Sequence, residues 1–183
     1  MPLRMSVTSQ HPVVCLGFLS VIENADLGFL GGYLLLNPAG RPLEFHCTAP
    51  VRPNRTQEIL YGAALRPFLY GELIGQTLLA KSRHTPLVVC TDSPAALAAR
   101  DTSQIPLVLV QAVDAASTSP QPSAPNLFRL GQSLVLTAPR FENDRQVICQ
   151  AWPSQAEQLD LLEPFERIRE ALMEAQAAAK QAA

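Results

Sequence analysis

Two acidic side chains, Glu58 and Asp92, occupy positions from which a carboxylate can do chemistry. Glu58 falls in the first turn of an expected helix, and Asp92 follows a short apolar segment expected to be a strand. If these two ends meet above one edge of a sheet, their oxygens are the hard ligands that Mg²⁺ prefers. Both residues also have a purely structural explanation. The helix dipole favours Glu58, and Asp92 ahead of Ser93 and Pro94 suits a helix N-cap.

Other reactive or charged side chains are weaker indications of a catalytic or binding site. His46 and Cys47 are neighbours in the sequence, but adjacent residues of a strand point to opposite faces, so they do not form a nucleophile and base pair. Three arginines flank the start of the expected helix, where they either contact an anion or remain solvated surface charges: Arg52, Arg55 and Arg66.

The elements that position these residues begin with three expected strands. Residues 13–22 form a nearly continuous apolar run, which is typical of a strand buried on both faces. Residues 31–36 resume the apolar pattern, and residues 37–40 have the composition of a tight turn. The next segment, 41–48, predicts a half-buried hairpin partner because it alternates Leu43, Phe45 and Cys47 against Glu44 and His46.

A long helical region and a strand, helix, strand unit follow. Asn54 and Gln57 supply an N-cap and its reaching side chain, and Pro67 predicts a kink or two helices, roughly 55–66 and 67–81. Residues 86–90 and 105–110 are short apolar strands on either side of a small helix at 95–100, which favours parallel pairing. The predicted fold class is therefore α/β with a mixed sheet.

The expected domain organisation is one core with a C-terminal addition. It comprises a loose leader at 1–12, an α/β core at 13–113, a flexible Pro/Ser-rich loop at 114–126, and a hairpin with a helix at 127–183. Residues 133–137 and 146–151 are the two strands expected for that hairpin. The helix begins at Pro164, and its apolar stripe either packs on the same domain, as we expect, or on another chain: Phe165, Ile168, Leu172 and Met173.

The composition is that of a folded domain with no strong attraction for polyanions. Of its 183 residues, 48% are hydrophobic and 16% charged, and the formal net charge is -2. No apolar stretch reaches the ~18 residues that a membrane span needs. The four cysteines form no C-x-x-C pair, and we expect buried free thiols in a soluble, cytoplasmic protein: Cys15, Cys47, Cys90 and Cys149.

Three segments, in this order, resemble the ribonuclease H-like superfamily over about residues 13–110. GGYLLLNPAGRPLEF resembles its second and third strands, and NRTQEILYGAAL the start of its first helix, whose metal-binding Glu is matched by Glu58. VVCTDS resembles its fourth strand, whose metal-binding Asp is matched by Asp92. The resemblance implies antiparallel strands one to three, then parallel strands, flanked by helices. It also implies phosphodiester hydrolysis by two cations about 4 Å apart.

The chain departs from this family on the first strand. The family carries an indispensable Asp near the middle of that strand, whereas residues 20–22 are Ser, Val and Ile. Glu23 and Asp26, at the end of the strand, are the nearest substitutes. The family's last acidic residue has two candidates here, Glu157 and Asp160.

These observations lead to three hypotheses from different classes. The first is a noncatalytic interaction or scaffold domain of ribonuclease H-like architecture with a decayed metal site, no cofactor, and an unknown protein partner or self-association. The alternative is a nuclease acting on nucleic acid with Mg²⁺ or Mn²⁺, in which Glu58 and Asp92 bind metal and Glu23 or Asp26, with a later carboxylate, completes the catalytic set. The third is a small-molecule sensor, which requires an apolar pocket with a few convergent polar groups.

Overall fold

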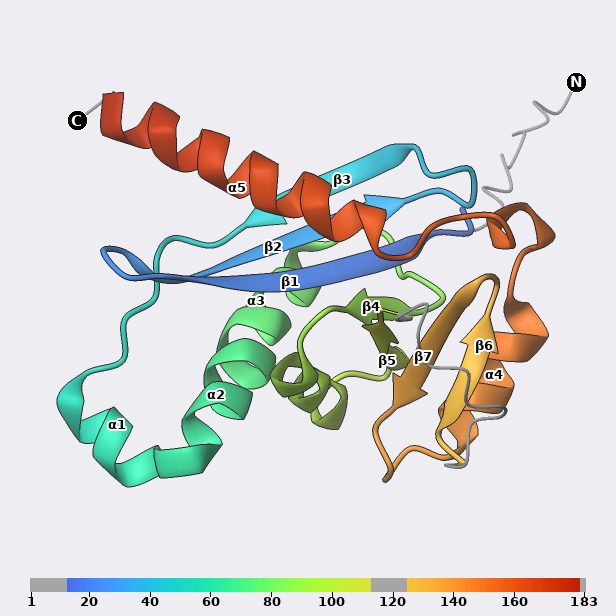
Figure 1. Cartoon of the computed structure of the whole chain (residues 1–183), viewed down its shortest axis with the longest axis horizontal. Coiled ribbons are helices and arrows are strands. Elements are labelled where there is room, and N and C mark those ends of the chain that lie inside the picture. Colours follow the sequence, from blue (N-terminus) through green and yellow to red (C-terminus); the bar gives the residue numbers. More distant parts are fainter. Residues whose placement is uncertain (1–12, 113–124, 182–183) are drawn as a thin grey trace, which may run out of the picture.

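The computed structural model describes residues 13–112 and 125–181, which build a mixed sheet of seven strands in the order β3-β2-β1-β4-β5-β7-β6 (Figure 1). β1 to β3 are antiparallel, β4 and β5 run parallel to β1, and the β6/β7 hairpin adds two antiparallel strands at the far edge. The predicted mixed α/β fold is thus confirmed. The strands are β1 Leu16–Asn24, β2 Gly28–Leu36, β3 Pro42–Cys47, β4 Val89–Thr91, β5 Leu107–Gln111, β6 Leu127–Leu130 and β7 Ser133–Thr137.

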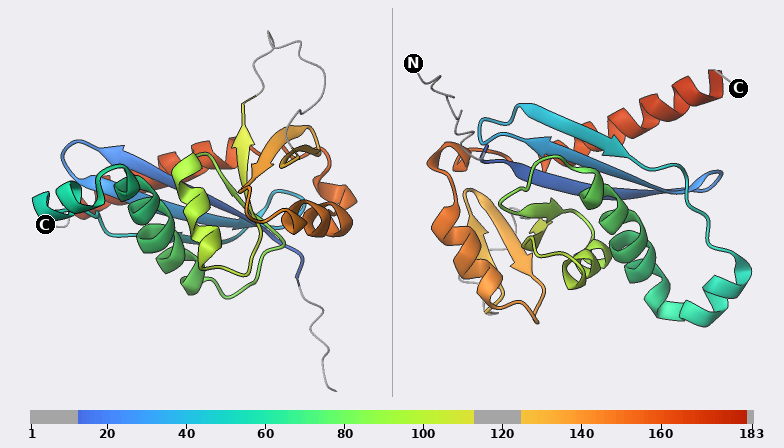
Figure 2. Two further views of the ribbon diagram at one scale, coloured as in Figure 1. Left: turned by 90° about the horizontal axis from the view of Figure 1, so that it is seen from below. Right: turned by 180° about the vertical axis from the view of Figure 1, so that it is seen from behind.

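Helices cover both faces of the sheet (Figure 2). α5 (Glu163–Gln181) packs on one face of β1 and β2, and the chain from α2 to α3 lies against the other. The remaining helices are α1 Arg55–Tyr61, η1 Gly62–Ala64, α2 Leu65–Pro67, η2 Phe68–Gly75, α3 Gln76–Lys81, η3 Pro94–Asp101, α4 Asn143–Ala151 and η4 Ser154–Ala156. Within 13–112 and 125–181, no helix combines the length and apolarity needed to cross a bilayer. The expected leader 1–12 and most of the expected loop 114–126 lie outside the described residues.

Two consecutive glycines in β2 allow helices to approach the sheet from both sides. A methyl group at Gly31 would lie 2.1 Å from Cγ2 of Ile74, and one at Gly32 would lie 2.4 Å from Cγ2 of Ile168. Neighbouring strand residues face opposite sides, so Gly31 makes room for η2 and Gly32 for α5. The G-G pair is therefore a packing requirement of a strand covered on both faces.

The helical region after β3 breaks at Gly62 and not at Pro67. α1 begins with the predicted capping box of Asn54 and Gln57, and it ends at Gly62, whose φ of +50° suits glycine. A new helical stretch starts after Ala64 and continues to Lys81, with η2 as a π-helix. Pro67 lies in the first turn of that stretch, where a missing N–H breaks no helical bond, so the two expected helices are present but divide at Gly62 and not at Pro67.

The expected strand at residues 146–151 is also wrong, because this segment belongs to α4. Asp144 and Ile148, four residues apart, are buried on one side of α4, while Val147 and Cys149 remain exposed, which is helical periodicity. β7 pairs instead with β6, a strand that the sequence analysis did not predict. On α5 the expected stripe is buried at Phe165, Ile168 and Leu172, whereas Met173 is exposed.

β3 alternates as predicted, but its polar face is the more buried one. Glu44 and His46 turn toward the segment that follows α3, while Leu43, Phe45 and Cys47 are exposed beside α5. β3 is an edge strand, so one of its faces extends beyond the covering helix. The exposed apolar face is thus a consequence of position in the sheet, which alternation alone does not encode.

The expectation of four buried thiols is right for two of them. All four cysteines are free, with Cys15 and Cys90 buried in the sheet. Burial raises the pKa of Cys90 to about 12, so this thiol packs as an inert apolar group. Cys47 and Cys149 are exposed, because one lies on the open face of β3 and the other on the outer side of α4.

Candidate site at the ends of β1 and β4

The parallel pairing of β1 with β4 brings Ser20 next to Asp92. Leu19 is the register partner of Thr91, so the next residue of each strand continues side by side. The Ser20 hydroxyl donates a hydrogen bond of 2.9 Å to Oδ2 of Asp92. Residues 20–22, where the resemblance places a first-strand carboxylate, therefore include a hydroxyl that donates to the carboxylate of Asp92.

A guanidinium completes this arrangement. Nη2 of Arg169, on α5, donates to the same Oδ2 of Asp92 at 2.6 Å. The Asp92 side chain is 18% exposed and that of Arg169 44% exposed, so the pair lies at the border between the core and solvent. Oδ1 of Asp92 is buried and has no hydrogen-bond partner among the described residues. The carboxylate is thus paired with a cation of the same chain.

Asp92 does not cap the following helix, so its expected structural role is wrong. The N-cap of η3 is Ser93, with extended backbone dihedrals and no side-chain capping bond. Its backbone N–H donates to Oγ1 of Thr91 at 3.2 Å. This frees the Asp92 side chain to turn toward Ser20 and α5.

Glu23, the nearest substitute for the missing carboxylate, points to the opposite face of the sheet. It is three residues beyond Ser20 on β1, and an odd separation reverses the direction of a strand side chain. Its carboxylate pairs with Nη2 of Arg66 at 2.7 Å, and Nη1 of Arg66 donates to the hydroxyl of Tyr70 at 3.4 Å. Burial raises the pKa of Tyr70; Arg66 opposes this, and the charges of Glu23 and Asp92 add to it.

Glu58 and Asp26 are exposed and do not join Asp92. Glu58 accepts from Nη1 of Arg55 at 3.1 Å within α1, a helix in which no residue is buried. Figure 1 shows α1 lying away from β4. Asp26 is in the β1/β2 turn, where its backbone N–H donates to the side chain of Asn24. Glu58 does share a hollow of about 440 Å³ with Glu23.

The candidates for a last acidic residue precede α5. Glu157 follows η4, and Asp160 accepts from the backbone N–H of Leu162 in the turn that leads into the helix. The α5 residue that reaches Asp92 is Arg169, which the sequence analysis missed. One signal could have found it: Arg169 follows the buried Ile168 and precedes the buried Leu172 by three, so it borders the apolar stripe that faces the sheet.

The donor set at this end of the sheet does not fit a pair of divalent cations. Two-metal hydrolysis needs several carboxylates around cations about 4 Å apart. Asp92 is the only one of the four predicted carboxylates to contact Arg169 and Ser20, and a guanidinium repels a divalent cation. Over the described residues, no three His, Cys, Asp or Glu side chains gather as metal ligands would.

Comparison with known proteins gives a likeness of fold only. No family model and no curated protein matches the chain. Solved structures that are similar to the chain include two of low identity. Human ENDOV is 13% identical with a TM-score of 0.39, over 87% of this chain and 86% of that one. An endonuclease V from Ciona intestinalis, solved with a 23mer DNA containing an inosine followed by a ribo-adenosine, is 13% identical with a TM-score of 0.34. That alignment covers 55% of this chain and about half, 47%, of the Ciona chain.

A second charged cluster joins β3 to the segment after α3. Oε2 of Glu44 lies 2.8 Å from Nε2 of His46, Oε1 meets Nδ1 of His84, and the backbone N–H of Arg83 donates to both oxygens. Burial alone would raise the pKa of Glu44, but these hydrogen bonds outweigh it and lower the pKa from 4.5 to about 2. This cluster fastens the edge strand to the α3 side of the sheet.

Proposed function

We propose that this chain is a noncatalytic interaction or scaffold domain of ribonuclease H-like architecture, in which an internal guanidinium takes the place of a metal beside the remaining carboxylate. The observation that carries the proposal is the double contact of Asp92 Oδ2, which accepts from Arg169 at 2.6 Å and from Ser20 at 2.9 Å. A carboxylate already neutralised within the fold is a poor ligand for an added cation. In this proposal the site stabilises the docking of α5.

Exposed apolar side chains support the interaction role. Ile59 and Leu60, on α1, are 64% and 77% exposed, and Leu43 and Phe45 lie open on the edge strand β3. An uncovered edge strand with apolar side chains is a common place for another chain to bind. We therefore expect either a second copy of this chain or another protein at these surfaces. The four free cysteines agree with a reducing compartment such as the cytoplasm.

Metal binding tests the proposal most directly. Titration of the full chain with Mg²⁺ and Mn²⁺ in a calorimeter should give no micromolar binding. Micromolar binding that Asp92→Ala or Glu58→Ala abolishes would contradict it. A gain-of-function variant gives a more specific test. Ser20→Asp combined with Arg169→Gln supplies a second carboxylate beside Asp92 and removes the guanidinium. This double variant should therefore bind Mn²⁺. Ser20→Asp with Arg167→Gln keeps the Asp92 contact of Arg169 and should bind much more weakly.

Self-association is measured by sedimentation velocity over a wide range of concentrations. Phe45→Glu and Ile59→Glu place a charge on the two exposed apolar surfaces, and each should shift the chain toward the monomer if that surface joins two copies. Glu72→Gln, on the exposed side of η2, is a charge-changing control outside both surfaces. If the chain is monomeric at every concentration, self-association is excluded and the expected partner is a different protein.

The alternative function is a divalent-metal nuclease that uses Glu58 and Asp92 with Glu23 or Asp26 and a later carboxylate. The shared hollow of Glu23 and Glu58 is the observation in its favour. Under the noncatalytic proposal, labelled single-stranded and double-stranded DNA and RNA should remain intact when they are incubated with the full chain and Mn²⁺. Metal-dependent cleavage that is lost in both Glu58→Gln and Asp92→Asn would establish the alternative and refute the noncatalytic proposal.

A further inference from the structure

β3 is an edge strand, and its hydrogen-bond pattern with β2 decides which of its residues face outward. The N–H of Thr48 donates to the carbonyl oxygen of Gly31 at 3.0 Å. Bonded and non-bonded pairs alternate along an antiparallel ladder. The main chain of His46 is therefore bonded to β2, whereas Phe45 and Cys47 direct their N–H and C=O groups away from the sheet. In the described part of the chain, no other segment bonds to these outward groups.

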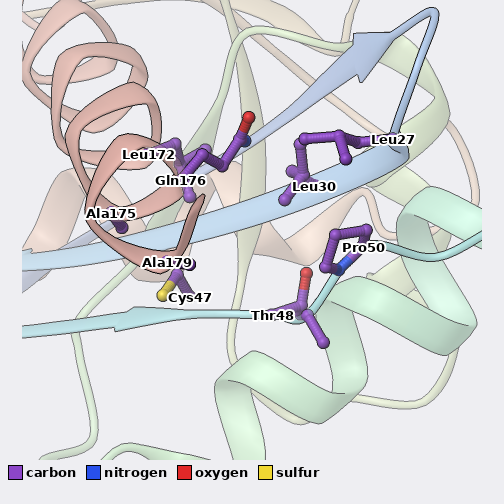
Figure 3. Close-up of a pocket in the computed structure, with 10 residues that line it drawn as sticks. Leu27, Leu30, Cys47, Thr48, Pro50, Leu172, Ala175, Gln176 and Ala179 are labelled. Carbon is purple, nitrogen blue, oxygen red and sulfur yellow. The ribbon is translucent and has the colours of Figure 1, made fainter. Parts of the chain in front are cut away.

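The side chains at the odd-numbered positions of β3 form an apolar strip along this edge. Leu43 and Phe45 are 38% and 39% exposed, and Cys47 is exposed as well. Figure 3 shows Cys47 on the α5 side of the sheet, where it lines an apolar pocket of about 450 Å³ together with Leu30 and Ala179. Edge strands are ordinarily protected by charged side chains or by a covering segment. An unpaired edge with an apolar strip is instead a template for another strand.

The opposite edge of the sheet, β6, is protected by a charge. The N–H of Thr137, next to β6, donates to the carbonyl oxygen of Asn126 at 3.0 Å. Arg129 lies three positions beyond Asn126, so its main chain faces outward by the same alternation. Its side chain is exposed, and a second copy paired at this position would set one guanidinium against another. β3 is therefore the edge that can accept a strand.

The sequence of β3 is complementary to itself in one antiparallel register. Outward residues must bond to outward residues of the second strand, which leaves few positions for a two-fold axis. An axis at Phe45 sets the two Phe45 rings together and places Leu43 opposite the partner's Cys47. On the other face it places the Glu44 carboxylate opposite the partner's His46, whose imidazole can donate to it. An axis at Glu44 would instead oppose two carboxylates, which is destabilising.

We propose that two copies of this chain pair through β3 about a two-fold axis at Phe45, so that their sheets join into one. The pairing forms about six main-chain hydrogen bonds between the two strands. It covers the apolar strip of each copy and links the Glu44 clusters of the two chains. This inference rests on the interaction role proposed above and names the partner for it.

Proline at the axis separates main-chain pairing from side-chain contact. Sedimentation velocity of the full chain at micromolar concentration should show a dimer. Phe45→Pro removes an outward N–H without breaking the ladder to β2, and Phe45→Ala removes the ring but keeps the N–H. Dimerisation should be about 30-fold weaker in Phe45→Pro than in Phe45→Ala, because two hydrogen bonds per dimer are lost.

Arg129→Pro, at an outward position of the opposite edge, is the matched control and should dimerise like the wild type. Urea unfolding of each proline variant checks that the chain still folds. A dimer that withstands Phe45→Pro, or one that is lost in Arg129→Pro, would overturn the proposal.

A cysteine cross-link tests the register and does not depend on proline. In a Cys149→Ser background, mild oxidation should join the thiol introduced by Leu43→Cys to the partner's Cys47. Without Leu43→Cys the two Cys47 residues lie more than ~13 Å apart, beyond the reach of a disulfide, and should not be joined. A dimer linked through Cys47 alone would refute the axis at Phe45.

Failure of this inference is distinguishable from failure of the noncatalytic role. A chain that is monomeric at every concentration would refute the β3 dimer, while the metal titration and the cleavage assay would still decide the noncatalytic role. Metal-dependent cleavage by a chain that dimerises through β3 would refute the noncatalytic role and leave the dimer in place.

Discussion

The contact between Arg169 and Asp92 predicts a measurable coupling energy. At ~4 Å between charge centres and an effective dielectric constant of about 20, the attraction is about 4 kcal/mol before the cost of desolvation. Exposed ion pairs contribute about 0.2–1 kcal/mol net, whereas breaking a buried pair costs about 3–5 kcal/mol. With Asp92 at 18% exposure and Arg169 at 44%, we expect a coupling of about 1.5 kcal/mol, between these limits.

The measurement is a double-mutant cycle on unfolding in urea. The variants are Arg169→Met, Asp92→Asn and their combination, and the fluorescence of the single tryptophan, Trp152, reports unfolding. A matched cycle on Arg167 and Glu163, an i,i+4 pair of the same helix, should give only about 0.3–0.5 kcal/mol.

A coupling for Asp92 and Arg169 no larger than that of the control pair would refute the reasoning. It would mean that the guanidinium is a surface charge that happens to lie near Asp92, and that the carboxylate remains available to another cation. Raising the salt concentration should reduce the coupling energy of the control pair more than that of Asp92 and Arg169, because dissolved ions screen exposed charge pairs more than partly buried ones.

Three further predictions concern the packing and the pH dependence of the fold. Gly32→Ala should destabilise the chain by about 1–3 kcal/mol through its clash with Ile168, and Gly32→Ala combined with Ile168→Ala should cost less than the sum of the two single variants in urea unfolding. The carboxylate of Glu44 should stabilise the fold by at most roughly 3 kcal/mol above pH 4.5, where the unfolded chain is also ionised. This contribution should be lost as the pH falls through about 2, so urea midpoints of wild type and Glu44→Gln should converge over that interval; a constant difference would contradict the lowered pKa. Tyr33→Phe removes a buried hydroxyl that has no hydrogen-bond partner in the part of the chain that the structure describes, so the thermal midpoint should stay the same or rise; a fall of several degrees would show that the hydroxyl is satisfied.

The sequence predicted those parts of the fold that short-range patterns specify. The apolar run of β1, the turn before β3 and the capping box of α1 are each encoded within a few residues, and all three are present. The errors arose where local patterns are ambiguous. The segment 146–151 suits a strand by composition, and its helical burial becomes evident only once Ile148 has a core to face.

The candidate site, too, was only partly predictable from the sequence. Asp92 and the absence of a carboxylate at Ser20 were visible in the sequence, because each follows from one position in one strand. The contacts of Asp92 with Ser20 and with Arg169 join residues that are 72 and 77 positions apart, and they exist only because β1 pairs with β4 and α5 docks on the resulting sheet.

By itself the sequence indicated the order of the elements from β1 to β5 and the absence of a carboxylate at residues 20–22. Tertiary structure alone decided that a guanidinium stands beside Asp92, that Glu23 turns to the other face, and that an apolar pocket forms under α5. The physical reason is that strand register and helix docking are set by burial of apolar surface over the whole sheet, and the polar side chains that meet at its border are fixed by that packing.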